Sequence, residues 1–204
     1  MSTHSSFQAS LPGFDTSRNR AEGLFFAIFP DAVTAKRIEQ LAHRLSVAHG
    51  LGGKPFPRGR FHVTLRHLGI FSEELPEGAI EWANQVAANT AMRPFRVEFN
   101  HAGHFGGKSG HRPFVLRGDE GLPGLFMLRD ALERALEQKG VPRGGKFEFT
   151  PHVTLLYDHH DDKDNPGVSE YLEPISWIVH ELVLVRSLLG RSQYEVLARW
   201  PLSQ

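Results

Sequence analysis

The chain has 204 residues, 40% of them apolar, and its 23 basic side chains balance 23 acidic ones. This length fits one domain of ordinary size or two half-domains that share a core. A net charge of zero argues against a protein that coats long nucleic acids by charge alone. With no cysteine and no run of about 18 apolar residues, we expect no disulfide, no thiolate chemistry, no membrane span and a cytoplasmic location.

Residues 1–22 are predicted to form a mobile N-terminal tail. They lack the basic start and apolar stretch of a secretory signal, and their Ser, Gly, Pro and Asn content suggests a mobile segment. Residues 23–204 are expected to form a single domain, and a monomer is the simplest expectation.

The domain is predicted to begin with a buried strand at Leu24–Phe29, because this short apolar run ends at a proline. Asp31 is expected to cap a helix that ends near Gly50. A Gly- and Pro-rich loop then leads into a strand that begins "HVTL" at His62. A helix over Ser72–Ala91 and a strand over residues 95–106 are expected to follow.

The same order of elements is predicted to start again near Pro113. A short strand there is followed by a helix over Leu122–Gln138, in which leucines recur at helical spacing. A second loop then leads into a second "HVTL" strand at His152. Two further strands are expected within residues 177–189 and 194–202.

A shift of 90 residues superimposes the two halves of the chain. It lays Leu24 on Phe114 and His62 on His152, which indicates pseudo-repeats over about 23–108 and 112–204. Short strand-helix-strand-strand units favour split, largely antiparallel sheets over a parallel doubly wound sheet. We therefore predict an α+β fold of two lobes, with two largely antiparallel sheets facing a central cleft and the helices outside.

The paired "HVTL" strands carry the functional signal. Side chains alternate faces along a strand, so His62, Thr64 and Arg66 are expected to share one face, as are His152 and Thr154. A single His-x-Thr is expected by chance about 0.4 times in a chain of this composition, so one copy would carry no weight. Two identical copies at equivalent points of a repeat favour a shared site over two structural histidines.

Two histidines across a cleft suit displacement at phosphorus. Because imidazole titrates near neutrality, one copy can act as general base while the other acts as general acid. The two threonine hydroxyls can hold the non-bridging oxygens, with Arg66 as an additional phosphate contact. Two stretches without Asp or Glu, residues 40–72 and 99–118, carry several Lys and Arg and fit a local anion site. This chemistry requires no metal and no cofactor.

These residues resemble a known family. The two "HVTL" copies, "GLFFAIFP", "FTPHVTLLYD" and "RSQYEVLARWPL" are similar to the two-histidine (2H) phosphoesterase superfamily, and most of all to the bacterial RNA 2′,3′-cyclic phosphodiesterases, also called 2′-5′ RNA ligases. The resemblance covers residues 23–202. It implies a fold of two α+β lobes, hydrolysis of terminal RNA 2′,3′-cyclic phosphates to 2′-phosphates, and the reverse 2′-5′ joining of RNA ends.

The resemblance also implies roles for matching residues. His62 and His152 would be the acid-base pair, and Thr64 and Thr154 the phosphate ligands. Our hypothesis for hydrolysis makes His152 the base and His62 the acid, with the roles exchanged in ligation. Relatives often carry Arg where this chain has Tyr157, so Tyr157 is taken as a nucleotide contact without charge.

Three other functions remain open from the sequence. The same site could act on a small cyclic nucleotide or another 2′-5′ linkage, or bind RNA ends without turnover. A zinc hydrolase is the third alternative, since the chain has 12 histidines. The histidine-rich stretch "DHHDDKD" at 158–164 is interpreted as a solvated loop, and His101, His104 and His111 lack the spacing of a zinc site.

Overall fold

The protein is described by a computed structural model that covers residues 22–71, 77–90, 92–106, 110–119, 121–143, 149–160, 167–188 and 193–203. The predicted tail therefore lies, apart from Glu22, outside the described residues. The elements in chain order are β1 (Glu22–Ile28), α1 (Ala32–Ala48), a 3₁₀ turn (Arg58–Arg60), β2 (Val63–Phe71), α2 (Ala79–Ala88), β3 (Phe95–His104), β4 (Arg112–Arg117), α3 (Pro123–Gln138), β5 (His152–Asp158), β6 (Ser169–Val179), β7 (Glu181–Leu188) and β8 (Gln193–Pro201).

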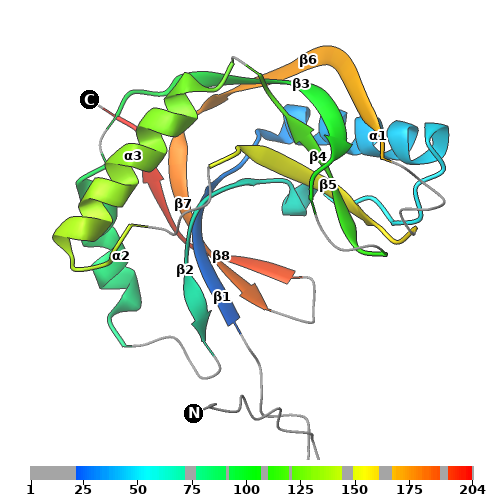
Figure 1. The fold of residues 1–204 in the computed structure, drawn as a ribbon. Coiled ribbons are helices and arrows are strands. Elements are labelled where there is room, and N and C mark those ends of the chain that lie inside the picture. Colours follow the sequence, from blue (N-terminus) through cyan, green and yellow to red (C-terminus); the bar gives the residue numbers. More distant parts are fainter. Residues whose placement is uncertain are drawn as a thin grey trace, which may run out of the picture.

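The strands form two four-stranded sheets, and every neighbouring pair described is antiparallel. Sheet 1 has the order β2-β1-β7-β8 and sheet 2 the order β5-β4-β3-β6 (Figure 1). The predicted α+β class with two antiparallel sheets is confirmed. The order strand, helix, motif strand also occurs twice, as β1-α1-β2 and as β4-α3-β5.

Neither sheet is formed by one half of the chain alone. β3 leaves the first half and pairs with β4 and β6 in sheet 2, whereas β7 and β8 return to sheet 1. β3 and β4 are consecutive strands with a short connection, and such strands usually pair. Each sheet therefore combines elements from both parts of the sequence.

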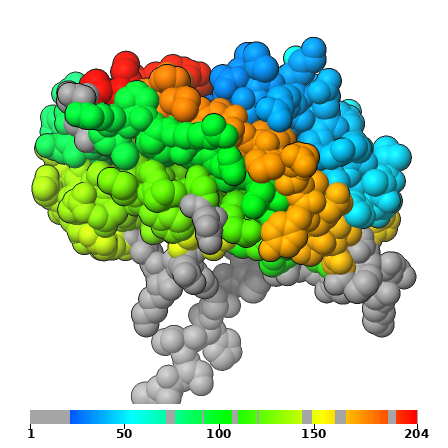
Figure 2. All heavy atoms as spheres, turned by 90° about the horizontal axis from the view of Figure 1, so that it is seen from above, coloured from blue at the N-terminus to red at the C-terminus, as the bar shows by residue number. Residues whose placement is uncertain are grey.

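The helices cover the outer faces of the two sheets. α1 contacts β5 and β6 of sheet 2, α3 contacts β2 and β3, and α2 contacts α3 and β8. Figure 2 shows α1, in blue to cyan, beside β6, in orange. α1 begins as predicted, because the Asp31 carboxylate accepts hydrogen bonds from the backbone N–H and the hydroxyl of Thr34 at 2.8 and 2.9 Å. The predicted leucines of α3 are all buried, at positions Leu125, Leu128, Leu132 and Leu136.

Two predicted elements differ in extent. The helix predicted over Ser72–Ala91 begins only at Ala79, after Gly78 in a left-handed conformation with φ of 79°, and residues 72–76 lie outside the described residues. The strand predicted within residues 177–189 is two strands in different sheets, β6 and β7, separated at His180. Both strands are apolar at this point, so the sequence pattern does not reveal the change of sheet. None of the described helices is long and apolar enough to cross a membrane.

Candidate active site

The two motif strands meet where the sheets adjoin. β2 is the outermost strand of sheet 1, β5 is the outermost strand of sheet 2, and the two are in contact. His62 directly precedes β2 and His152 opens β5. The fold thus brings the two predicted histidines to one junction, from two edge strands whose apolar side chains Val63 and Val153 are fully packed in the core.

Both histidines are held in the same way. The Nδ1 of His62 bonds the carbonyl of Arg60 at 2.7 Å, and the Nδ1 of His152 bonds the carbonyl of Thr150 at 2.8 Å. A carbonyl oxygen only accepts, so each Nδ1 carries the hydrogen and donates. The Nε2 atom of each neutral ring is then left with a lone pair that can take or return a proton.

His62 lies in an aromatic environment on the sheet 1 side. Its ring centroid is 5.2 Å from that of Phe25, 5.8 Å from Phe29 and 5.1 Å from Tyr194. Burial lowers the pKa of His62 to about 4, although the hydrogen bond to the Arg60 carbonyl works in the opposite direction. Arg60 and the protonated form of His152 lower this pKa further, so His152 lies close enough to His62 to affect its titration.

His152 has a corresponding environment on the sheet 2 side. Its ring packs against Phe105, with 4.8 Å between the centroids. Burial lowers the pKa of His152, its bond to the Thr150 carbonyl raises it, and the charge of Arg117 lowers it. Both imidazoles therefore favour the neutral form at neutral pH.

Thr64 and Thr154 occupy equivalent positions beside the histidines. Thr64 pairs with Ala27 of β1, and Thr154 pairs with Val115 of β4. Both side chains are half-buried. Among the described residues, neither hydroxyl has a hydrogen-bond partner within the protein, which leaves both available to a ligand.

A bulge follows each threonine and reverses the expected alternation. In β2 the pairs Ala27–Thr64 and Phe26–Arg66 leave Leu65 without a partner. The second copy repeats this bulge, at Leu155 of β5. One extra residue moves the side chains that follow it, up to any further bulge, to the other face of the sheet.

The shared face predicted for Arg66 is therefore wrong. Arg66 pairs with Phe26, whose side chain lies in the main core. Its guanidinium donates from Nη2 to the Pro142 carbonyl at 2.9 Å and lies 3.5 Å from Oε1 of Glu133 in α3. Arg66 thus joins β2 to α3, and His67 takes the face that Arg66 was expected to have, with its ring 5.3 Å from that of Phe25.

Arg66→Gln is accordingly expected to lower the free energy of unfolding by about 1–2 kcal/mol, because a charged hydrogen bond beside the buried Glu133 is lost. We expect kcat to stay within about threefold of the wild-type value. Urea unfolding and steady-state kinetics on the same preparation test this. A large loss of kcat at unchanged stability would return Arg66 to the active site.

Tyr157 lies beyond the second bulge and pairs with Pro113. Its ring stacks on His111 at 4.4 Å with an interplanar angle of 7°, and it meets Phe56 edge-on at 5.8 Å. Burial raises the pKa of Tyr157, the neighbouring Tyr194 raises it further, and Arg60 lowers it. Tyr157 belongs to sheet 2, whereas Tyr194 belongs to sheet 1 and Phe56 and Arg60 to the segment before β2, so Tyr157 borders the same junction as the histidines. Its role as a nucleotide contact stays a prediction.

The stretch interpreted as a solvated loop begins with a buried residue, so that interpretation is wrong for Asp158. This carboxylate is fully buried and accepts from the backbone N–H of Gly52 at 2.9 Å and from Nε2 of His104 at 2.9 Å. Burial alone would raise its pKa, but the hydrogen bonds from Gly52, His160 and His104 outweigh it and lower the pKa to about 2. Residues 161–164 of the stretch lie outside the described residues.

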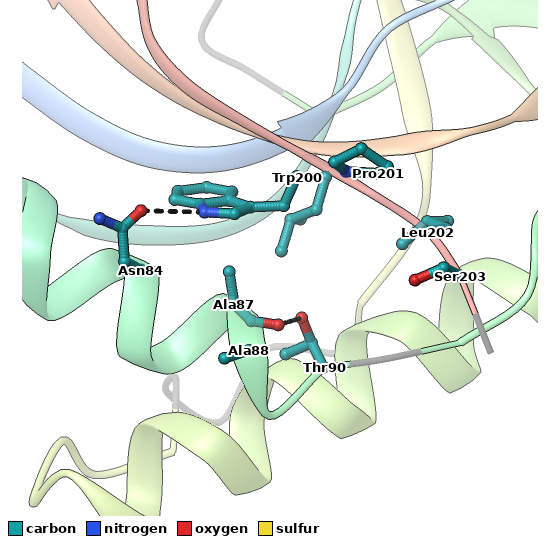
Figure 3. A pocket seen from close by; sticks show the side chains of 9 residues that line it. Asn84, Ala87, Ala88, Thr90, Trp200, Pro201, Leu202 and Ser203 are labelled. Carbon is teal, nitrogen blue, oxygen red and sulfur yellow. Dashed lines mark hydrogen bonds between the residues drawn. The ribbon is translucent and has the colours of Figure 1, made fainter.

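The remaining predicted histidines are dispersed. His101 bonds Ser169, His104 bonds Asp158, and His111 stacks on Tyr157. Within the described ranges, no three His, Cys, Asp or Glu residues come together as a metal site. An apolar hollow between α2 and the end of β8, where Trp200 donates to Asn84 at 3.0 Å, contains none of the motif residues (Figure 3).

Two residues next to the histidines were not singled out from the sequence. Arg117 of β4 is the cross-strand partner of His152, and Arg60 supplies the carbonyl that holds His62. Both lie in the stretches without Asp or Glu, which was the only sequence signal for them. Locating them required the strand register and the turn at residues 58–60.

Comparisons with known proteins agree with this fold. The family model of the 2′-5′ RNA ligase superfamily matches residues 29–191. The crystal structure of TT0787 from Thermus thermophilus is similar at a TM-score of 0.67 and 25% identity, over 88% of this chain and 97% of that one. The LigT protein of E. coli in complex with 3′-AMP is similar at a TM-score of 0.64 and 25% identity, over 90% and 99% of the two chains. No curated protein sequence matches the chain at a significant level.

Proposed function

The chain belongs to the 2′-5′ RNA ligase superfamily of 2H phosphoesterases, and we propose that it hydrolyses terminal RNA 2′,3′-cyclic phosphates to 2′-phosphates without a metal. The observation that carries this proposal is the paired His-x-Thr site, with each imidazole anchored through Nδ1 and each Nε2 available for proton transfer. The complexes of LigT with 3′-AMP and with phosphate support a nucleotide phosphate as the ligand class.

The reaction requires one proton to enter and one to leave the reacting centre. A water molecule attacks phosphorus and gives its proton to the base, while the bond from phosphorus to the 3′ oxygen breaks and that oxygen takes a proton from the acid. Thr64 and Thr154 donate hydrogen bonds to the non-bridging oxygens as the charge on them grows. The products are a 2′-phosphate and a 3′-hydroxyl. When the 5′-hydroxyl of a second RNA attacks phosphorus in place of water, the bond to the 3′ oxygen breaks in the same way and the two RNA ends are joined by a 2′-5′ bond.

The environments of the histidines favour one assignment of roles. Because burial lowers the pKa of His62 to about 4, His62 is the neutral partner and acts as the base in hydrolysis. His152 is then the acid. This assignment is the opposite of our hypothesis from the sequence, in which His152 was the base and His62 the acid.

The proposal is tested with a cyclic-phosphate-ended RNA and a 2′,3′-cyclic mononucleotide, each with and without EDTA. We expect turnover of the RNA in EDTA and a product that carries a 2′-phosphate. Activity that EDTA abolishes would exclude the metal-free mechanism. Turnover of the mononucleotide alone would favour a small cyclic nucleotide as the substrate, and turnover of neither would favour a module that binds RNA ends.

The pH dependence of kcat/KM follows from the lowered histidine pKa values. The acid must be protonated in the free enzyme, and both pKa values lie below the ordinary value of 6.5. The protonated form is therefore lost at lower pH than for an exposed histidine. We expect kcat/KM to be higher near about pH 5.5 than at about pH 8, and to fall about tenfold per unit above about pH 7. An optimum above about pH 8 would contradict these roles.

A further inference from the structure

We infer that the guanidinium groups of Arg60 and Arg117 bind the phosphates of the substrate, one beside each motif histidine. This inference rests on the proposed phosphodiester substrate, but it concerns which groups supply positive charge. The motif threonines are neutral donors, and Arg66 is directed to α3. A phosphodiester bound between the two histidines would otherwise face two imidazoles that favour the neutral form.

Arg60 ends the turn before β2 and packs against two aromatic rings. Its guanidinium carbon is 3.8 Å from the ring centroid of Phe56 and 5.0 Å from that of Tyr194, and Nη2 donates to the Tyr194 hydroxyl at 3.3 Å. Tyr194 itself packs edge-on against His62, with 5.1 Å between the centroids. Tyr194 therefore packs against both Arg60 and His62, while Phe56, which packs against Arg60, meets Tyr157 of sheet 2 edge-on.

Arg117 has the same arrangement beside the second histidine. It is the cross-strand partner of His152, so the two side chains lie on the same face of sheet 2. Its guanidinium carbon is 5.8 Å from the ring centroid of Phe105, and that ring packs at 4.8 Å against His152. Nη2 donates to Nδ1 of His101 at 3.2 Å, and Nε2 of His101 bonds Ser169, so His101 orients the guanidinium as a neutral acceptor.

Both arginines have hydrogen-bonding groups that the described part of the protein does not use. Each side chain is half-buried, and the Nε atom of each is buried without a hydrogen-bond partner in the described part of the protein. Within those same residues, neither guanidinium forms an ion pair with a carboxylate. A guanidinium has five N–H donors in a planar fork that matches phosphate oxygens. The two guanidinium groups are thus partly desolvated cations without a carboxylate partner. A phosphate group would supply the negative charge and the hydrogen-bond acceptors that they lack.

Binding of inorganic phosphate and of a nucleoside 2′-monophosphate, measured by calorimetry, tests this without turnover. We expect Arg60→Gln and Arg117→Gln to weaken each Kd about tenfold or more. Arg117→Lys keeps the charge and should recover part of the loss. Arg96→Gln is the matched control, because Arg96 is an exposed arginine of β3 whose partner is Glu98, and its Kd should stay within about twofold of wild type.

A positioning or folding role predicts different results. Thermal unfolding of each ligand-free variant detects loss of the fold. If a Gln variant is unstable, the charge effect is measured with Arg117→Lys and with the wild-type protein, whose phosphate binding should weaken as the salt concentration rises. In Arg117→Gln the descending limb of the kcat/KM profile should also move to higher pH, since Arg117 lowers the pKa of His152. A phosphate Kd within about twofold of wild type in either folded Gln variant overturns the assignment for that arginine. The two proposals can fail separately. If the protein binds phosphate through these arginines but hydrolyses no cyclic phosphate, the proposed function is wrong and the inference about the arginines still holds.

Discussion

Alanine at His62 or His152 is expected to lower kcat on a 2′,3′-cyclic nucleotide by roughly 10²–10⁴-fold. Each ring is anchored through Nδ1 to a backbone carbonyl, so its Nε2 is the atom that moves a proton. Removal of either ring leaves one of the two proton transfers without a partner. We expect KM to change much less than kcat, because the threonines and the flanking arginines remain.

The double variant His62→Ala/His152→Ala sharpens this test. Groups that act as one unit have non-additive effects, so the double variant should be little slower than the slower single variant. His43→Ala is the control, since His43 is an exposed residue of α1 outside both motifs, and it should behave as wild type. A single variant that keeps more than about a tenth of the wild-type kcat would exclude the two-histidine mechanism.

Asp158→Ala is expected to lower the free energy of unfolding by roughly 3 kcal/mol or more. The Asp158 carboxylate is fully buried, and removing it leaves the N–H of Gly52 and the ring of His104 without their acceptor. Arg112, 3.8 Å away, also loses its nearby negative charge. Urea unfolding at neutral pH measures the loss, and Asp130→Ala, on the exposed face of α3, is the matched control.

The same residue predicts how stability depends on pH. The pKa of Asp158 is lowered to about 2 from an ordinary value of 3.8, so its contribution is complete above about pH 4 and is lost as the pH falls toward 2. Wild-type stability should therefore fall more steeply than that of Asp158→Ala between about pH 4 and about pH 2. Parallel curves over this interval would mean that the carboxylate is not stabilised by folding.

Much of the site could be predicted because its signals are local. The two "HVTL" copies, the Asp31 cap and the leucines of α3 depend on residues close together in sequence, and the structure places them as expected. The two histidines meet because each motif strand lies at the edge of its sheet. The repeated order of strand, helix and motif strand was sufficient to indicate that the two motifs are related by pseudo-symmetry.

The predictions from the sequence were wrong where contacts with distant parts of the chain determine the local structure. The bulges at Leu65 and Leu155 depend on the register with β1 and β4, and the bulge at Leu65 places Arg66 on the face opposite to the predicted one. The same registers place Phe26, not Leu24, in correspondence with Phe114, so the offset in this strand is 88 residues while it is 90 at the histidines.

Asp158 is a second residue whose environment could not be predicted from the local sequence. Its acidic neighbours suggested solvent, but its partners come from a loop more than 100 residues away and from β3. A composition-based interpretation detects neither of these contacts. Burial of a single charged residue is decided by tertiary structure.

The loop before the first motif is attached to the second motif strand. Gly52 donates to Asp158, Phe56 N–H donates to the Leu155 carbonyl at 2.8 Å, and a Cβ at Gly53 would lie 1.8 Å from the Tyr157 carbonyl oxygen. The segment that delivers His62 is therefore assembled on the strand that carries His152. Together with the return of β7 and β8 to sheet 1, this makes the two halves of the repeat interdependent. A fragment that holds one motif would lack the surface on which its histidine is set, so the two histidines are positioned only in the complete fold.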